Sequence, residues 1–521
     1  MTNSSDHNRS FDVVIIGGGL NGLAAATVLA RAKLKVVVLE RRSIVGGLAA
    51  GEEFHPGYRS AGVIHDTTGL LPELDLTSHG LRRTVRPPPI LAIGADDRAL
   101  LLHHDPTEAA SELMTAGGRD VEPYSRFRAF IERIKPFARR LVSELPPDWL
   151  GDGMADWRAM LSTGIALRRL GKTDMMELLR LGPMSVADSL DEQFTDPLLK
   201  AALAVPALRG SFAGPFSPGT CGALLRYETL ARGAVVGGSD ALVDSLVRAA
   251  EAAGAVILTG REVSSILVSQ SRVTGVACDD GQPVEAGLVL ASCDPKRTLL
   301  ELLGARELAP GDEQAIRAYR MRGLTAQVNL ALNRPLRFRA RPDLDIEFAR
   351  TGVSLLELER TFDAAKYGRF SDTAALDIHV PSIANPQSAP PGHSSVSILI
   401  HGVPYDLNGG WNDARRDELG DTVVKQLSSY VDDLDSAIVA RQVLTPADIE
   451  SKYGVTGGHI YHGEHGLDQL LVRPTRACAR YATPIDGLYL CGSGSHPGGG
   501  ITCAPGFIAA KTILNRRGRR S

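Results

Sequence analysis

Three glycines near the start of the chain have the spacing of a phosphate-binding turn. Gly17, Gly19 and Gly22 form G-x-G-x-x-G between a β-branched run, FDVVIIG, and a segment with helical spacing, LAAATVLARAKL. The first glycine allows the tight turn, the second lets the backbone approach a pyrophosphate, and the third allows close packing of helix on strand. A second apolar run, KVVVLE, ends in Glu40, whose carboxylate can accept hydrogen bonds from ribose hydroxyls. The pattern predicts a β-α-β unit that binds a dinucleotide.

The residues after this unit narrow the choice of dinucleotide. Glu40 disfavours NADP, because its carboxylate would repel the 2′-phosphate. Six residues later the chain has a glycine pair, Gly46 and Gly47. Backbone without side chains at that place can run beside a cofactor longer than NAD.

A second glycine-rich loop follows an apolar run near the other end of the sequence. GLYLCGSGSHPGGG covers residues 487–500, and a helical segment begins at about Gly506. One NAD does not need two such loops, whereas FAD does. The second loop would cover the pyrophosphate-ribityl chain and the O2 side of the isoalloxazine, and the helix N-terminus would stabilise negative charge on the reduced flavin. The two loops together predict FAD as the cofactor.

Length and composition limit the class of protein. A chain of 521 residues is too long for one ordinary core, which predicts more than one domain. The formal net charge of −3 gives no basic field for nucleic acid. The six cysteines are scattered without a C-x-x-C pattern, which predicts reduced thiols in a cytoplasmic protein rather than a disulfide framework or a zinc site. Neither a signal peptide nor a transmembrane helix is expected.

The basic residues at the end of the sequence have two readings. Arg516, Arg517, Arg519 and Arg520 are expected to be a solvated end, with peripheral contact to an anionic membrane surface as the second reading.

The α/β segments predict a discontinuous organisation. Residues 1–85, 225–300 and 480–521 are expected to form the cofactor domain, because they hold both glycine loops and the amphipathic helix ALVDSLVRAAEAAG. Residues 86–224 and 301–479 are expected to form an inserted α+β substrate domain. Within it, 155–205 reads as helical throughout, and 320–480 reads as strands and loops with one helix at about 413–433.

Two segments carry a family resemblance. DVVIIGGGLNGLAAATVLARAKLKVVVLERRSIVGG resembles the FAD fingerprint of the phytoene desaturase and amine oxidase superfamily. GVTGGHIYHGEHGLDQLLVRPTRACARYATPIDGLYLCGSGSHPGGG is similar to the pyridine nucleotide-disulphide oxidoreductase domain 2 branch of that superfamily. The resemblance implies an α/β fold with a Rossmann-type, p-hydroxybenzoate-hydroxylase-like FAD domain. It also implies that the Val263 backbone contacts adenine and that residues 60–65 pass near the isoalloxazine ring. Leu48 stands where carotenoid desaturases usually have arginine.

The motifs and the resemblance together define a set of predicted site residues. Two histidines are catalytic candidates: His65, on the segment expected near the flavin ring, and His496, in the second glycine loop. The HxxHxxH spacing of His459, His462 and His465 is read as a structural loop rather than a metal site. The predicted cofactor-binding residues are Gly17, Gly19, Leu20, Asn21, Gly22, Glu40, Arg41, Gly46, Gly47, Leu48, Val263, Gly492, Ser493, Gly500 and Ile501.

The predicted function is FAD-dependent dehydrogenation, or desaturation, of an apolar small molecule with a polyene or cyclohexadiene-type skeleton. Flavin N5 would take the hydride. The reduced flavin would pass its electrons to O2, a quinone or a partner protein. Three alternatives stay open: a flavin-dependent amine oxidase, a flavin isomerase without net oxidation, and a non-catalytic binding protein on the same fold.

Overall fold

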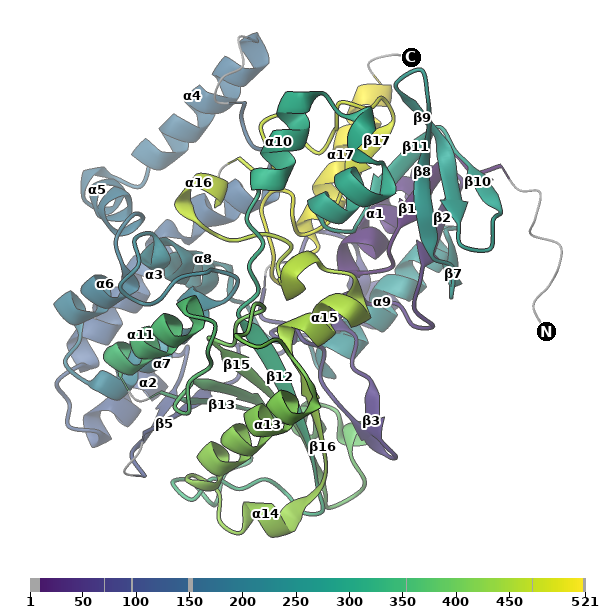
Figure 1. Cartoon of the computed structure of the whole chain (residues 1–521). Coiled ribbons are helices and arrows are strands. Elements are labelled where there is room, and N and C mark those ends of the chain that lie inside the picture. The colour runs from purple at the N-terminus through teal and green to yellow at the C-terminus, as the bar shows by residue number, and fades with distance from the viewer. Residues whose placement is uncertain are drawn as a thin grey trace.

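The computed structural model describes residues 10–69, 71–94, 97–148, 153–352, 354–470 and 472–518. The polar N-terminal segment and two arginines of the basic tail, Arg519 and Arg520, lie outside these ranges. Two large sheets organise the described chain, one in the upper part of Figure 1 and one in the lower part. No helix within these ranges combines the length and apolar character needed to cross a membrane.

The first sheet is parallel and has the strand order β17-β11-β1-β2-β7. Its central strands are short apolar runs that are fully buried, as expected for a parallel sheet covered on both faces. All five strands come from the three segments that the sequence attributes to the cofactor domain. Their bounds are Val13–Ile16 (β1), Val36–Glu40 (β2), Val256–Thr259 (β7), Leu288–Ala291 (β11) and Leu488–Leu490 (β17).

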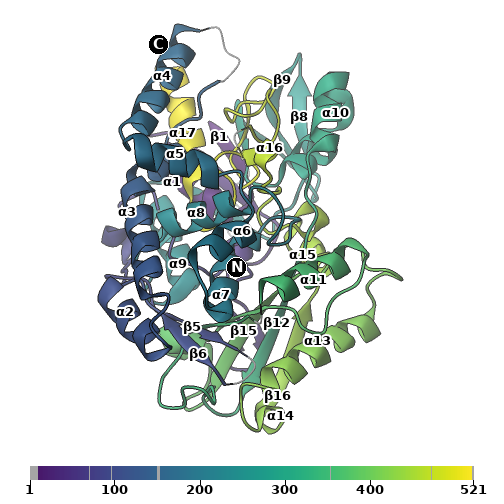
Figure 2. The same ribbon diagram turned by 90° about the vertical axis from the view of Figure 1, so that its left-hand side faces the viewer.

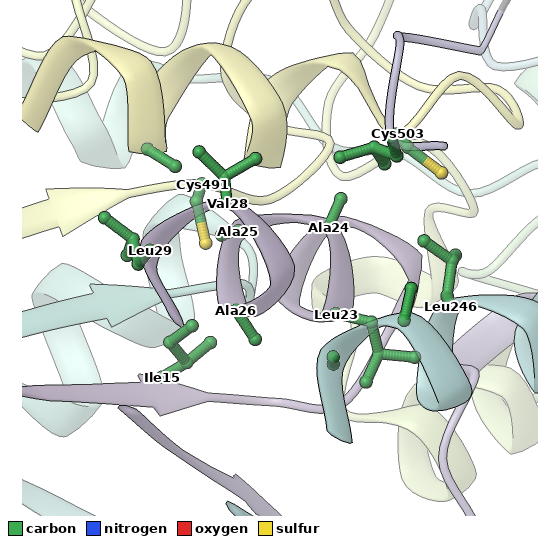
Figure 3. Packing of buried hydrophobic residues seen from close by; sticks show 14 of the residues in the cluster. Ile15, Leu23, Ala24, Ala25, Ala26, Val28, Leu29, Leu246, Cys491 and Cys503 are labelled. Atoms are coloured by element: carbon green, nitrogen blue, oxygen red, sulfur yellow. The ribbon is translucent and has the colours of Figure 1, made fainter. Parts of the chain in front are cut away.

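Three helices cover one face of this sheet. Helix α1 (Leu20–Arg31) packs against α9 (Gly238–Ala252) and α17 (Ala504–Arg517). Figure 3 shows the small residues Ala24, Ala25 and Ala26 of α1 within this core. The small residues let the helices approach closely. A Cβ at Gly506 of α17 would lie 1.9 Å from the Asn21 carbonyl oxygen. The N-termini of α1 and α17, each of which follows a glycine loop, therefore lie in contact.

A three-stranded antiparallel sheet, in the order β10-β9-β8, packs on the other face. Its strands are Val263–Ser269 (β8), Arg272–Cys278 (β9) and Pro283–Glu285 (β10). Beside them lie the π-helical turn Arg297–Leu302 and α10 (Pro310–Ala318).

The second large sheet is mixed, with the order β16-β12-β15-β14-β13-β5-β6. Only the β13–β5 pair is parallel. All seven strands come from the segments that the sequence attributes to the substrate domain. They are Ile90–Ile93 (β5), Ala99–Leu102 (β6), Thr325–Leu332 (β12), Phe348–Thr351 (β13), Leu376–His379 (β14), Ser394–His401 (β15) and Ile438–Leu444 (β16). A short hairpin, Glu53–His55 (β3) and Tyr58–Arg59 (β4), lies next to β15.

A group of helices forms one side of the molecule, facing the viewer in Figure 2. The stretch expected to be helical throughout is divided into separate helices, because Gly171 takes a positive φ of 87° and Pro183 and Pro197 cannot continue a helix. The helices are Pro106–Thr115 (α2), Val121–Ser143 (α3), Met154–Arg168 (α4), Lys172–Leu181 (α5), Val186–Gln193 (α6), Pro197–Leu208 (α7) and Thr220–Leu230 (α8).

The later part of the chain contains more helix than the sequence predicts. The helix expected at about 413–433 is α13 (Asp413–Ser428), followed by the short α14 (Leu434–Ala437). The expectation of strands and loops elsewhere is wrong for α11 (Leu355–Lys366), α12 (Pro381–Ala384), α15 (Pro446–Tyr453) and α16 (Leu467–Leu470).

Candidate active site

A large cavity lies at the carboxyl ends of the parallel strands. Its volume is about 1050 Å³, and Ile16, Glu40 and Ser292 line it just where β1, β2 and β11 end. This edge is where open α/β sheets bind their ligands. We call this cavity the dinucleotide cavity.

The first glycine loop forms the floor of the dinucleotide cavity. Gly17 has a φ of +94°, and a Cβ at Gly22 would lie 2.2 Å from the Gly17 carbonyl oxygen, so neither position accepts a side chain without strain. Gly19 is the N-cap of α1 and provides no side-chain cap. A Cβ at Gly19 would meet only Ser292 Oγ, at 3.8 Å. The first N–H groups of α1 are therefore left for a ligand, which is the requirement for a bound phosphate.

Glu40 reaches from the end of β2 to the same loop. Its Oε2 accepts a hydrogen bond from the Gly18 N–H (2.7 Å) and its Oε1 accepts one from the Arg42 N–H (2.9 Å). Each oxygen keeps a second lone pair. The carboxylate is held in place and can still accept from ribose hydroxyls.

A direct contact joins the two glycine loops. The Asn21 side-chain amide Nδ2 donates to Ser493 Oγ at 3.1 Å, although 472 residues separate them in the sequence. The other amide atom, Asn21 Oδ1, is buried without a partner. In the second loop, Gly500 has a φ of +107° and a Cβ there would meet nothing within 4 Å. An orphaned acceptor and glycines with open space beside them fit an extended cofactor between the loops.

The structure brings the predicted cofactor residues together. All of them except Gly22 and Gly492 line the dinucleotide cavity. Gly22 lies beneath the first loop, and a Cβ at Gly492 would lie 2.4 Å from the Ser292 carbonyl oxygen, so Gly492 allows the second loop to cross β11. Their contacts with a bound cofactor stay predictions.

Several residues of this cavity carry no local sequence signal. The segment that begins at Tyr453 closes one side, and the Arg42 guanidinium lies 4.7 Å from the Tyr453 ring centroid. Arg41 Nη2 donates to the Lys452 carbonyl oxygen at 2.6 Å, which ties this segment to β2. The other lining residues outside the predicted cofactor set are Ile16, Leu39, Ala49, Ile64, Arg261, Glu262, Ser292, Cys293, Arg297, Leu302, Gly454, Val455, Ile460, His462 and Cys503. Ile64 lies on the segment 60–65 that the resemblance places near the flavin ring. Ile16 and Leu39 belong to apolar strand runs, and Ser292 and Cys293 directly follow one.

A second cavity continues from the first. It has a volume of about 730 Å³, and it shares three lining residues with the dinucleotide cavity: Ile64, Gly500 and Ile501. We call it the substrate cavity. Its other lining residues are Asp66, Thr68, Gly69, Pro206, Arg209, Ala223, Arg226, Tyr227, Leu230, Ala231, Tyr461, His465, Leu470, Gly499 and Thr502.

A buried ion-pair network supports one wall of the substrate cavity. Arg209 pairs with Asp66 (Nη1–Oδ2 3.3 Å) and with Asp377, and Arg350 Nε contacts Asp377 Oδ1 at 3.4 Å. Burial alone would raise the pKa of Asp377, but the Arg209 and Arg350 guanidinium groups hold it well below its usual value. The pKa of Asp66 is lowered in the same way, with burial opposed by Arg209 and by hydrogen bonds from Thr68. Both carboxylates are therefore ionised.

Arg226 is the one substrate-cavity cation, within the described chain, that has no carboxylate partner. Its Nη2 donates to the carbonyl oxygens of Gly499 (2.9 Å) and Pro497 (3.4 Å), and its Nε is buried without a partner. Burial lowers the pKa of Arg226 to about 10, so it is still charged at neutral pH. Asp66 and Asp377 balance the charges of Arg209 and Arg350. Because Arg226 has no such partner among the described residues, this wall carries excess positive charge.

Neither catalytic candidate lines the dinucleotide cavity or the substrate cavity. His65 is buried in a stack with His379 (ring centroids 4.7 Å apart) and does not line either cavity. Burial and the neighbouring His379 lower its pKa to about 3. His496 Nε2 lies 2.8 Å from the Leu141 carbonyl oxygen at the end of α3, and burial lowers its pKa to about 4. Their catalytic roles stay predictions, and both imidazoles are neutral at physiological pH.

The three histidines of the HxxHxxH segment have separate surroundings. His459 Nδ1 accepts from the Gly463 N–H (3.2 Å), and His465 Nε2 accepts from the Gly499 N–H (3.2 Å). His462 lines the dinucleotide cavity. Within the described ranges, no cluster of three His, Cys, Asp or Glu side chains could hold a metal ion.

The fold and the site define the class of protein. It has a discontinuous Rossmann-type dinucleotide domain, an inserted substrate domain and two adjoining cavities. A family model described as "Flavin containing amine oxidoreductase" matches residues 20–506. The chain belongs to this family, so it is a flavin oxidoreductase.

Curated relatives cover nearly the whole chain. The mouse (Mus musculus) "Pyridine nucleotide-disulfide oxidoreductase domain-containing protein 2" is 32% identical over 97% of this chain and 93% of its own length. A component of the limonene dehydrogenase of Castellaniella defragrans is 28% identical over 98% and 95%. "Phytoene desaturase (lycopene-forming)" of Pseudescherichia vulneris is 27% identical over 95% and 96%. The resemblance seen in the sequence is confirmed.

Solved structures show the same fold. A putrescine oxidase bound to putrescine aligns with 98% of this chain and 100% of its own, with a TM-score of 0.58 at 17% identity. The fold class predicted from the sequence is confirmed.

Proposed function

We propose that the protein is an FAD-dependent dehydrogenase, or desaturase, that removes a hydride from an apolar small molecule with a polyene or cyclohexadiene-type skeleton. The observation that carries the proposal is the junction at Ile64, Gly500 and Ile501. There the dinucleotide cavity opens into a substrate cavity whose remaining walls include Pro206, Ala223, Leu230, Ala231 and Leu470. A ligand in the second cavity would contact the end of a cofactor in the first.

FAD fits the dinucleotide cavity by the chemistry of its lining. The α1 N-terminus at Gly19 would hold the pyrophosphate, Glu40 the adenosine ribose, and Asn21 with Ser493 the chain between the loops. A bound flavin supplies hydride acceptance. The residues of this chain contribute orientation of the substrate and exclusion of water.

Charge in the substrate cavity disfavours an amine substrate. Among its described lining residues, Asp66 is the single carboxylate, and Arg209 and the Thr68 N–H already engage it. Arg226 adds an unbalanced positive charge. An ammonium group would meet repulsion without a free carboxylate, which would cost several kcal/mol in a partly desolvated site, on the order of 4 kcal/mol for charges about 4 Å apart.

The wall residues hold their protonation states fixed near neutral pH. Burial raises the pKa of Tyr461, so its hydroxyl stays protonated. Burial and then the Arg226 guanidinium hold the pKa of His465 well below its usual value, so the imidazole stays neutral. Its Nε2 already accepts the Gly499 N–H. Neither group is therefore suited to accept the proton that dehydrogenation releases.

The relatives support the same substrate chemistry. Two of them are named for limonene dehydrogenation and phytoene desaturation, and both names denote removal of hydrogen from hydrocarbons. We extend this class of substrate to the present chain. The electron acceptor that we propose is O2, a quinone or a partner protein.

Anaerobic reduction of the purified protein tests the proposal. The released cofactor is first identified as FAD, and the flavin absorbance is then followed after addition of limonene, phytoene or putrescine. We expect bleaching by a hydrocarbon and none by putrescine. Bleaching by the amine alone would establish the amine oxidase instead, and a converted product of unchanged mass would establish an isomerase. A protein that refuses FAD would support the binding-protein alternative.

A matched pair of variants locates the reaction. Ala223→Phe fills the substrate cavity from α8 without reaching the dinucleotide cavity, whereas Ala166→Phe adds the same ring on α4, away from both cavities. We expect both variants to retain FAD and only Ala223→Phe to lose bleaching. Equal bleaching by both would place the substrate elsewhere.

A further inference from the structure

A second charged cleft lies outside the flavin and substrate cavities. Its volume is about 950 Å³, and it is formed by the chain near Arg83, the face of α3 that carries Arg139, and the turn after α8 at Arg232. Ala231 lines both this cleft and the substrate cavity. We call it the arginine cleft.

Half of the cations in the arginine cleft are neutralised by neighbours. Arg86 pairs with Asp105 (Nη1–Oδ2 2.5 Å), and Arg128 pairs with Glu228 (Nη1–Oε2 2.5 Å). Lys135 pairs with Glu132. The remaining three are Arg83, Arg139 and Arg232. Throughout the described ranges, none of these three forms an ion pair.

Backbone carbonyls hold two of these arginines in place. Arg83 Nε donates to the Gly233 carbonyl oxygen (2.6 Å), and its Nη2 donates to Thr67 (3.1 Å) and Gly69 (3.2 Å). Arg139 Nε donates to the Thr229 carbonyl oxygen at 3.2 Å. These bonds fix the orientation of both guanidinium groups but do not neutralise them.

The Arg232 guanidinium repels both of the other arginines. Burial lowers the pKa of both Arg83 and Arg139, and Arg232 lowers each further. The carboxylates that oppose this have smaller effects: Asp66 on Arg83 and Glu132 on Arg139. His104, which also lines the cleft, has its pKa lowered to about 4 by burial and is neutral. Three cations without an ion-pair partner in the described chain, two of them held in a fixed orientation, are suited to an anion with several oxygens.

We propose that Arg83, Arg139 and Arg232 bind a phosphoryl group, either as a free phosphate or diphosphate or as the head of an amphipathic molecule. In the second case Ala231 marks where the apolar part passes into the substrate cavity. Guanidinium groups donate charge-assisted hydrogen bonds to phosphate oxygens, and the carbonyl contacts hold Arg83 and Arg139 in a fixed orientation for this. The proposal stands on this cluster alone and does not depend on the proposed dehydrogenase function.

Calorimetric titration of the FAD-loaded protein tests the site, because bound FAD keeps the probe out of the dinucleotide cavity. The probes are inorganic pyrophosphate and dodecyl phosphate. We expect binding that weakens as salt rises. Arg232→Gln and Arg139→Gln should each weaken it by about 10- to 100-fold, the effect of one lost charge-assisted hydrogen bond. The control is Arg158→Gln, an exposed α4 cation outside the cleft.

Each outcome decides one point. Absence of binding by both probes, or binding that Arg232→Gln and Arg158→Gln change equally, would overturn the proposal. If dodecyl phosphate binds at least tenfold more tightly than pyrophosphate and Ala223→Phe removes that advantage, the ligand is amphipathic. Equal or tighter binding of pyrophosphate identifies a free anion. Intact FAD absorbance in each variant excludes misfolding as the cause.

Discussion

Leucine in place of Gly19 should weaken flavin binding strongly and leave the fold intact. The Gly19 backbone has φ −69° and ψ 172°, which any residue adopts. A Cβ there would meet only Ser292 Oγ at 3.8 Å, so the larger side chain would extend into the dinucleotide cavity. It would fill the space in which a phosphate meets the first N–H groups of α1.

The magnitude follows from the contacts that would be lost. Two charge-assisted hydrogen bonds at about 1.5–3 kcal/mol each amount to about 3–6 kcal/mol, or roughly a 10²- to 10⁴-fold weaker Kd for FAD. The apoprotein should be as stable as wild type or up to about 1 kcal/mol more stable. Replacing a glycine that has ordinary dihedrals lowers the conformational entropy of the unfolded chain.

Gly22→Ala is the contrasting variant in the same motif. Its Cβ would lie 2.2 Å from the Gly17 carbonyl oxygen, so α1 must move away from the turn, at a cost of about 1–3 kcal/mol. Urea unfolding of the apoproteins and fluorescence titration with FAD measure the two effects. Gly19→Leu protein that binds FAD within tenfold of wild type, or that unfolds like Gly22→Ala, would refute the reasoning.

Three further predictions concern other parts of the molecule. Because the pKa of His65 is lowered from 6.5 to about 3, the unfolded chain binds a proton between these pH values that the folded chain does not. Stability should therefore fall as pH drops through this window, and His65→Phe should flatten the slope by up to about 1.4 kcal/mol per pH unit in urea unfolding. A double-mutant cycle of Asn21→Ala and Ser493→Ala should give a coupling of about 0.5–1.5 kcal/mol for apoprotein unfolding, and additive effects would contradict the contact. Leu161→Gln on α4, where the leucine is 66% exposed, should change stability by less than about 0.5 kcal/mol. Leu203→Gln, where it is 4% exposed, should cost about 3 kcal/mol or more in the same assay.

The cofactor half of the site was predictable because its geometry is local. A turn that must bend at Gly17 and admit a phosphate at Gly19 leaves its mark in a few neighbouring positions. The pairing of the two loops was predictable for a different reason: one NAD would leave the second loop without a role, whereas one FAD would use both. What remained hidden was the contact itself, since nothing near Asn21 in the sequence indicates Ser493.

The substrate cavity was not predictable in the same way. Arg209, Asp66 and Asp377 are ordinary charged residues in sequence, and only the packing of α7 beside β14 turns them into a buried network. Helix α15, by contrast, was missed although its signals were present. Thr445 and Asp448 form a capping box, Pro446 occupies the first turn, and Gly454 ends the helix with a φ of +67°.

The strand order of the parallel sheet has a consequence for the order in which the chain folds during synthesis. β1 and β2 emerge from the ribosome first and β11 follows later, but β17 joins the sheet only after residues 301–479 have been made. Until the second glycine loop has emerged, Asn21 has no Ser493 to contact and a flavin would be held on one side only. A flavin held by both loops could therefore be captured only after the second loop has emerged, and it would stabilise the contact between the two glycine loops. When flavin is scarce, chains without the cofactor should open at the contact between the two glycine loops, and proteases should cut there first.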